Sequence, residues 1–191
     1  MNQDEELLIR KAQRGNIAAF EELVKRYEDK VMSIIFNMLN DAEDARDVYQ
    51  DVFMKVFLTI KKFRFQSKFY TWLFRIAVNT SINYRKKRTS QQKETLENYI
   101  EENKHDAEIT IQNNSDNPEK HLLDMELGKH IQRSINLLSP KQKAVFVLRH
   151  YHGYKLAEIA EILNCAEGTV KNYLFRSLQK LKKELKEFRL N

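Results

Sequence analysis

The sequence is poor in the residues that interrupt or cross-link a chain. Four glycines and two prolines in 191 residues leave few points where a helix must stop, so long helices are expected. The single cysteine, Cys165, excludes an intrachain disulfide and fits a reducing cytoplasm. No run of 18 or more apolar residues is present, so we expect no insertion into a membrane. The acidic start, MNQDEELLIR, is not expected to act as a signal peptide.

Patterns that mark chemistry are also missing. The five histidines show no metal-ligand spacing, and we find no Cys/His cluster, nucleophile–base pair or glycine-rich phosphate loop. The acids of residues 41–51 could imitate a metal site, but they fall on one helical strip without a converging partner. We therefore expect no catalytic residue, no metal and no cofactor, and a protein that is not an enzyme.

Charge is distributed in blocks, although the net charge is only +6. Residues 1–60 and 91–130 are net acidic, whereas residues 61–90 and 131–191 are net basic. Residues 61–90 contain nine Lys or Arg, seven aromatic residues and no acid. Positive charge attracts phosphates and flat rings stack on bases, so this stretch predicts a surface for unpaired nucleic acid.

Helical spacing of apolar residues predicts an all-α fold of two small domains. Helices are expected at 3–14, after Asn16, after Asp41 and from Phe69 to about Arg85. Residues 89–117 lose the pattern and carry seven acids, which indicates a flexible acidic linker, although a short helix near 96–100 stays open. The domains are therefore placed at 1–88 and 118–191.

The helix after Asp41 has two different faces. One broad arc is apolar and predicts a core face. The opposite arc carries four polar residues with Met54 and Leu58 among them, and Asp44, Asp47, Gln50, Asp51 and Met54 are called here the acidic strip. Acids around exposed apolar side chains fit a protein-binding surface, and they also fit a charged surface with two incidental hydrophobes. The pattern alone leaves both interpretations open.

The second domain contains a helix-turn-helix pattern. Ser139-Pro140 and Gln142 predict a capped helix start. In LAEIAEILNCAEGTVKNYLFRSL (156–178), one apolar helix face is followed by the turn Asn164-Cys165 and a second helix packed by Val170, Leu174 and Leu178. Such a second helix can enter a DNA major groove, and a helix-turn-helix can also be a protein-packing trihelical unit; the flanking excess of Lys and Arg favours DNA binding. Its candidate DNA-facing residues are Thr169, Lys171, Asn172, Tyr173, Phe175 and Arg176.

Four segments together resemble the extracytoplasmic-function sigma factors of bacterial RNA polymerase. They are AFEELVKRYEDKV, DAEDARDVYQDVFMKVF, FYTWLFRIAVNTSINYRKKR and LSPKQKAVFVLRHYHGYKLAEIAEILNCAEGTVKNYL, which occur in family order. The resemblance implies a promoter-specificity subunit whose first domain binds the polymerase and the −10 element and whose second domain reads the −35 element. It also implies an anti-sigma partner and a cytoplasmic location.

The resemblance gives roles to particular residues. It implies that the acidic strip docks on the core polymerase, that the KFRFQSKF loop (62–69) holds a flipped −10 base, and that Asn79 helps to select it. The expected −10 surface comprises Lys61, Phe63, Arg64, Phe65, Ser67, Lys68, Trp72, Arg75, Asn79 and Asn83. Lys171, Asn172, Phe175 and Arg176 of the second helix map onto the −35 reading helix. Asn172-Tyr173 stands where many relatives have Ser-Arg, which puts the −35 sequence preference in doubt.

Two other classes of function remain as alternatives. A helix-turn-helix repressor or activator explains the second domain, but it leaves the basic aromatic stretch and the acidic strip without a role. An enzyme acting on nucleic acid lacks the residues described above. Initiation with core polymerase would distinguish the sigma factor from the repressor.

Overall fold

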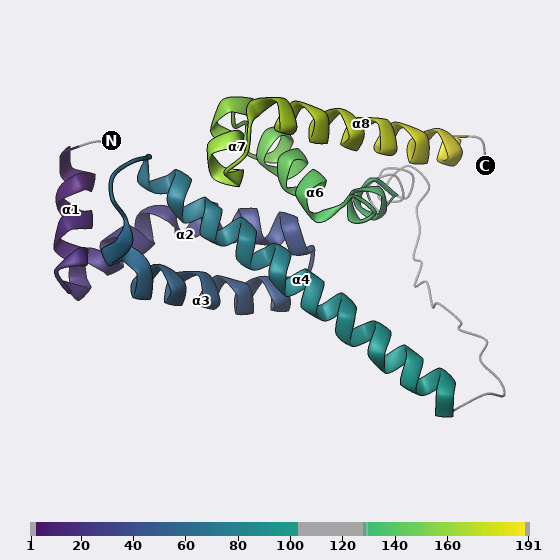
Figure 1. Cartoon of the computed structure of the whole chain (residues 1–191), viewed down its shortest axis with the longest axis horizontal. Helices are drawn as coiled ribbons and strands as arrows, with labels where there is room; N and C mark the ends of the chain where they lie inside the picture. Colours follow the sequence, from purple (N-terminus) through teal and green to yellow (C-terminus); the bar gives the residue numbers. More distant parts are fainter. Residues whose placement is uncertain (1–2, 103–127, 129, 190–191) are drawn as a thin grey trace, which may run out of the picture.

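The computed structural model describes residues 3–102, 128 and 130–189, and these residues fold into helices joined by short turns (Figure 1). The predicted all-α class is confirmed. The first part of the chain contains α1 (Gln3–Gln13), α2 (Ile17–Leu39), α3 (Ala42–Thr59), the 3-10 turn η1 (Ile60–Lys62) and α4 (Phe69–Glu102). The second contains α6 (Pro140–Phe146), the π-helical turn η2 (Val147–Tyr151), α7 (Leu156–Leu163) and α8 (Glu167–Arg189).

The first three helices begin at the residues that the sequence predicts, and α1 ends where it was expected to end. Gly15 has φ +90°, a left-handed conformation that closes α1 at little cost for glycine. The Asn16 side chain accepts a hydrogen bond from Ala19 N, and Asp41 Oδ1 accepts from the first-turn amides of α3. The left-handed Asn40 (φ +60°), which ends α2, was not predicted.

The core of the first unit lies where α2, α3 and α4 pack together. Val48, Val52 and Val56 on α3 are fully buried, which confirms most of the predicted apolar arc. Phe57 is the exception, because it is 49% exposed and meets Phe20 edge-on at 5.1 Å. Burial of these apolar side chains supplies most of the stability of the helices, because helix propensity alone is too weak to hold them folded.

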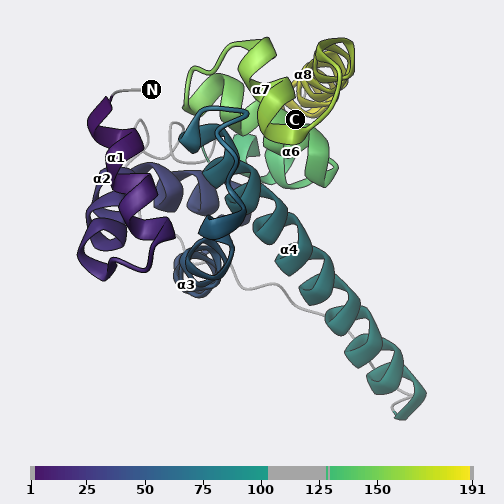
Figure 2. The same cartoon turned by 60° about the vertical axis from the view of Figure 1, so that its left-hand side comes forward.

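Helix α4 is longer than predicted. It was expected to end near Arg85, but it continues to Glu102 and its final turns extend away from the other helices (Figure 2). Residues 89–102, expected to begin the linker, are helical, which agrees with the short helix left open near 96–100; the domain bounds stay a prediction. The remaining linker residues, 103–117, lie outside the described residues, as do residues 118–127 of the second domain.

The second unit confirms the predicted capping box and helix-turn-helix. Ser139 Oγ accepts from Gln142 N at 3.4 Å, and Gln142 Oε1 accepts from Ser139 N at 3.1 Å. Val170 is fully buried between α7 and α8, and left-handed Asn164 (φ +50°) makes the turn. Leu178 was expected in the core but is 45% exposed; Ser177 occupies the buried position instead and donates to Tyr173 O at 2.7 Å.

The two units pack together in one arrangement. Helix α7 lies against the N-terminal half of α4, and the buried residues of both units form one continuous apolar cluster (Figures 1 and 2). Within the described part of the chain, no helix is long and apolar enough to span a membrane. This packing places the basic loop after α3 beside the helix-turn-helix.

Candidate nucleic-acid and polymerase interfaces

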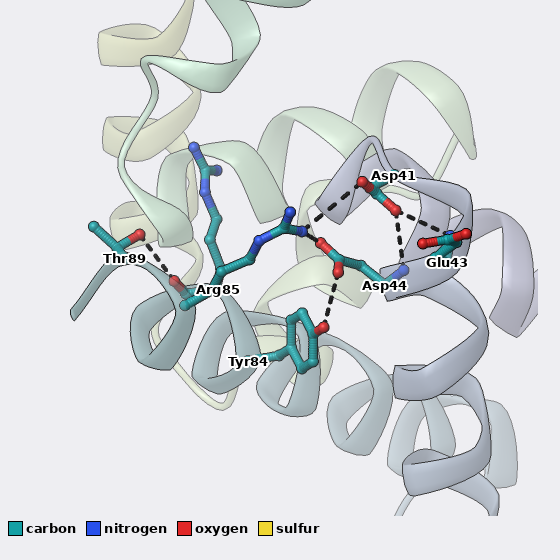
Figure 3. Close-up of polar contacts among 7 residues, drawn as sticks. Asp41, Glu43, Asp44, Tyr84, Arg85 and Thr89 are labelled. Carbon is teal, nitrogen blue, oxygen red and sulfur yellow. Dashed lines mark hydrogen bonds and ion pairs between the residues drawn. The ribbon is translucent and has the colours of Figure 1, made fainter. Parts of the chain in front are cut away.

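The acidic strip on α3 has one end engaged within the fold and the rest exposed. Asp44 Oδ1 accepts a hydrogen bond from the Tyr84 hydroxyl at 2.8 Å, and its other oxygen pairs with Arg88 of α4 (Figure 3). The Asp44 side chain is only 15% exposed as a result. Arg88 also reaches Asp41 Oδ2 at 3.8 Å. Asp44 therefore fastens the start of α3 to α4.

The rest of the acidic strip is open to solvent. Asp47, Gln50 and Asp51 are exposed, and Met54 is 61% exposed. Leu58, one turn further on, is 67% exposed. This arrangement offers a partner a row of acceptors followed by apolar side chains, with few contacts to break within the protein.

The segment Phe63–Lys68, called here the basic loop, is held from inside by one aromatic ring. Phe63 was predicted to line a base pocket, but its ring is 5% exposed and lies 5.4 Å from Trp72 and 5.5 Å from Phe69, centroid to centroid. Arg64, Gln66 and Lys68 are exposed, while Phe65 and Ser67 are half-buried. The loop thus presents its polar and cationic side chains, and Phe63 supports it as a core residue.

Lys61 of the expected −10 surface is exposed in η1, and helix α4 carries the other remaining residues. Asn79 and Asn83 are exposed, and Trp72 is half-buried within the aromatic cluster around Phe63. Arg75 is engaged by the second unit: its Nη2 donates to Glu161 O at 2.6 Å and its Nε to Ile162 O at 3.3 Å. These carbonyls belong to the last turn of α7, where a cation also complements the helix dipole.

A groove of about 700 Å³ separates the basic loop from the helix-turn-helix. Gln66, Ser67, Lys68 and Arg75 line one side. The other side is formed by the last turn of α7 and the turn that follows it, through Ala160, Glu161, Asn164 and Cys165. In this arrangement the second unit covers part of the expected −10 surface.

The N-terminal half of α8 remains accessible. Lys171, Asn172, Phe175 and Arg176 are exposed, Phe175 to 60%, while Thr169 and Tyr173 are half-buried. Lys171 Nζ forms an exposed ion pair with Glu167 at 3.0 Å, one turn earlier. The predicted set is thus brought together on one helix, with Arg176 and Asn172 free to present their base-reading groups.

Sequence reasoning missed the contacts that join the two units. Tyr70 Oη donates to Glu158 Oε1 at 2.8 Å, and the Tyr70 ring lies parallel to that of Tyr154 at 6.1 Å. Burial, and then the hydrogen bond to Glu158, raises the pKa of Tyr70 to about 12. The hydrogen bond from Lys155 N, followed by that from Tyr70, lowers the pKa of Glu158. Nothing in the spacing of residues 88 positions apart could have revealed this pair.

A second missed contact places two cations around one asparagine. Lys143 is fully buried, and its Nζ donates to Asn136 Oδ1 at 2.7 Å. The Arg85 guanidinium of α4 donates to the backbone oxygen of the same Asn136. Burial, and then the charge of Arg85, lowers the pKa of Lys143 to about 8. Keeping the buried Lys143 side chain in its charged form therefore costs free energy of folding.

The chemistry available in these surfaces is that of binding. Among the described residues, no three His, Cys, Asp or Glu side chains are grouped so that they could hold a metal ion. The groups gathered around the basic loop and α8 are cations, amides and rings, which contact phosphates and bases.

Comparison with known proteins matches both units to one family. Residues 23–91 match the family model described as sigma-70 region 2, and residues 129–181 match that of sigma-70, region 4. The chain is similar to the RNA polymerase sigma-H factor of Pseudomonas aeruginosa, with 31% identity covering 96% of this chain and 94% of the relative. It is 33% identical to the extracytoplasmic-function (ECF) RNA polymerase sigma-E factor of Haemophilus influenzae, covering 95% of each chain. Identity to the ECF sigma factor SigW of Bacillus subtilis is 32%, covering 94% of this chain and 95% of the relative.

Solved structures share the fold. CnrH in complex with the cytosolic domain of CnrY superposes with a TM-score of 0.65 at 22% identity, covering 96% of this chain and 97% of that one. RpoE from Bartonella quintana in complex with the anti-sigma factor NepR superposes with a TM-score of 0.62 at 22% identity, covering 87% of this chain and 96% of that one. At this identity the likeness concerns the fold alone.

Proposed function

This chain belongs to the extracytoplasmic-function sigma factors of bacterial RNA polymerase, and we propose that it directs the core enzyme to promoters through three surfaces. The observation that carries the proposal is the pairing, within the unit at 1–88, of an exposed acidic strip with a basic loop that contains no acid. A helix-turn-helix regulator that acts alone has no need of this pair. The unit at 118–191 adds a reading helix of the kind that enters a major groove.

Each surface has its own task in the proposal. Asp47, Gln50, Asp51 and Met54 dock on the core polymerase, while Asp44 holds the strip in place through Tyr84 and Arg88. The basic loop and α4 receive the melted −10 strand. Helix α8 reads the duplex −35 element, with Arg176 and Asn172 at base edges and Lys171 at a phosphate.

Promoter melting requires binding energy from the −10 surface. Unstacking a base costs a few kcal/mol, which stacking and contacts to the extruded base must offset. Arg64, Lys68 and Arg75 supply phosphate contacts, and Asn79 supplies an amide that can select a base. Because Arg75 donates to the carbonyls of α7 in this structure, use of Arg75 on DNA requires α7 to move away from α4.

The proposal includes partners and a location. The core polymerase performs the chemistry of transcription, so the chain itself catalyses nothing. It acts in the cytoplasm on promoter DNA. An anti-sigma factor is its third partner, a proposal supported by the solved complex of RpoE, which shares its fold, with the anti-sigma factor NepR.

The test is transcription with bacterial core RNA polymerase and a promoter library. Specific initiation that depends on the chain is expected, and Asn79→Ala and Phe65→Ala are each expected to reduce open-complex formation. Asn37→Ala, at a half-buried asparagine on α2 that lies outside all three surfaces, serves as the matched control. Unchanged open complexes with both variants would contradict the −10 role. Stable operator binding without polymerase, and no initiation with it, would favour a repressor.

A further inference from the structure

Helix α1 has no part in the three surfaces, yet it contacts the basic loop directly. It packs on α2 through buried Ile9 and Ala12, and the Tyr27 hydroxyl of α2 donates to Glu5. The helix is thus firmly attached to the unit that carries the loop. Its polar side chains near the C-terminal end, Arg10 and Gln13, are directed at residues about 50 positions later in the chain.

Gln13 satisfies two backbone carbonyls at the start of the basic loop. Its Nε2 donates to Ile60 O at 3.0 Å and to Phe63 O at 2.8 Å. Both N–H groups of the Gln13 side-chain amide are therefore hydrogen-bonded to backbone carbonyls where α3 ends and the basic loop begins. Ile60 O also accepts from Phe63 N at 3.0 Å, so Gln13 extends the hydrogen bonding of η1 into the loop.

Phe65 occupies a backbone conformation that needs such support. Its φ of +59° lies in the left-handed region, which a bulky side chain rarely adopts without surrounding constraints. The Arg10 guanidinium lies 4.6 Å from the Phe65 ring centroid, in cation–π geometry. Glu6 orients that guanidinium, since its Oε1 accepts from Arg10 Nε at 2.9 Å and from Nη2 at 2.6 Å.

The loop is consequently fixed on two sides. The Phe63 ring anchors it within the aromatic core, and α1 anchors its carbonyls and the Phe65 ring from outside. The exposed Arg64 and Gln66 and the half-buried Ser67 lie on the short segment that these contacts hold in place. A loop that is already shaped before it meets DNA does not have to be ordered on binding, which preserves affinity and selectivity.

We propose that Gln13 and Arg10 are positioning residues that hold Phe63–Lys68 in the conformation that receives an unpaired promoter base. The inference rests on the proposed function, because it assumes that the loop contacts that base. Neither residue has to touch DNA. Each acts through the loop, Gln13 through the carbonyls of Ile60 and Phe63 and Arg10 through the ring of Phe65.

The first test replaces Gln13 by methionine, which has a similar length and no donor. Holoenzyme is formed with bacterial core polymerase, and its affinity is measured for single-stranded −10 oligonucleotides from a promoter selected in the transcription experiment, with each base varied in turn. Loss of two hydrogen bonds is expected to reduce discrimination between the preferred base and the others by about tenfold. Gln3→Met, at an exposed glutamine on the same helix, is the matched control and should retain full discrimination.

The second test addresses the contact with Phe65. Arg10→Met is expected to reduce the same discrimination by about threefold, the size of an exposed cation–π contact. Arg10→Lys should restore part of it, because the cation returns without the flat guanidinium. Glu6→Gln leaves the Arg10 guanidinium in place, so it should reduce the discrimination between bases less than Arg10→Met does.

These measurements separate the inference from the function on which it rests. If wild-type holoenzyme shows no preference among single-stranded bases, the role of the loop fails and the inference fails with it. If the wild type discriminates and Gln13→Met discriminates equally well, the inference alone is overturned, even where the variant unfolds at a lower temperature. Loss of discrimination with unchanged affinity for core polymerase and for duplex −35 DNA is the supporting result.

Discussion

Tyr70 on α4 donates a hydrogen bond to Glu158 on α7, and this contact joins the two halves of the chain. The Glu158 carboxylate also accepts a hydrogen bond from Lys155 N at 2.9 Å, at the start of α7. Close by, Arg75 donates to the carbonyls at the other end of the same helix. Both ends of α7 are therefore fastened to α4, which bears the expected −10 surface.

Removal of the Tyr70 hydroxyl should weaken this junction. Tyr70→Phe is expected to lower the free energy of unfolding by about 1 kcal/mol, because the hydrogen bond is lost while the ring contact with Tyr154 is kept. A double-mutant cycle with Glu158→Gln, followed by urea denaturation, measures the coupling. Tyr151→Phe, at a half-exposed tyrosine, is the control. Additive effects of Tyr70→Phe and Glu158→Gln would show that the pair contributes nothing.

The same pair predicts a pH dependence at the alkaline end. Burial and the bond to Glu158 raise the pKa of Tyr70 from its usual 10 to about 12. The protonated hydroxyl is favoured in the folded state, so its contribution is fully present below pH 10 and is lost as the pH rises toward 12. Stability measured across this range should fall more steeply in the wild type than in Tyr70→Phe. Parallel profiles would contradict the assignment.

Lys143 predicts the opposite trend at lower pH. Burial and the nearby Arg85 lower its pKa from about 10.5 to about 8, so the unfolded chain binds more protons than the folded one between these values. Stability should therefore rise from pH 8 to 10.5, by at most about 3 kcal/mol. Lys143→Met should remove this rise, whereas Lys141→Met, at an exposed neighbour, should keep it. Denaturation of the wild type, Lys143→Met and Lys141→Met across this pH range measures the rise in stability.

The acidic strip should divide into a structural and a binding part. Asp44→Asn is expected to cost about 1 kcal/mol of stability, because it removes the charge that pairs with Arg88 and accepts from Tyr84. Asp51→Asn, at an exposed position, should leave stability unchanged and weaken binding to core polymerase. Thermal unfolding and a core-binding titration of both variants test this division. Equal effects of the two variants in both assays would contradict it.

The reading helix offers a test of base against phosphate contacts. Arg176→Ala is expected to cost about 1–3 kcal/mol on the selected −35 duplex and to relax selectivity at one base pair. Lys171→Ala should weaken binding to all sequences alike and reduce the salt slope by about 1. Holoenzyme titrations on −35 duplexes at several salt concentrations measure both quantities. Lys180→Ala, beyond the expected contact residues of α8, is the control.

Local sequence patterns predicted the structure correctly where all the interacting residues lie within one short segment. The caps at Asn16, Asp41 and Ser139 act through hydrogen bonds within three residues, so spacing alone identifies them. The buried Val170 and the apolar arc of α3 follow from helical period. The end of α4 was misplaced because residues 89–102 are mostly polar, and only Leu96, Tyr99 and Ile100 give a weak helical period there.

The sequence by itself determined the helical class, the helix-turn-helix, the basic loop and the acidic strip, because each depends on residue type and spacing along a few turns. Tertiary structure alone decided which of these residues are free to bind. It placed Phe63 in the core, engaged Asp44 with Tyr84 and Arg88, set Arg75 against α7, and supported the loop from α1. The hydrogen bonds of Asp44, Arg75 and Gln13 join residues 40 to 86 positions apart, and their formation depends on how whole helices pack, which no local pattern records.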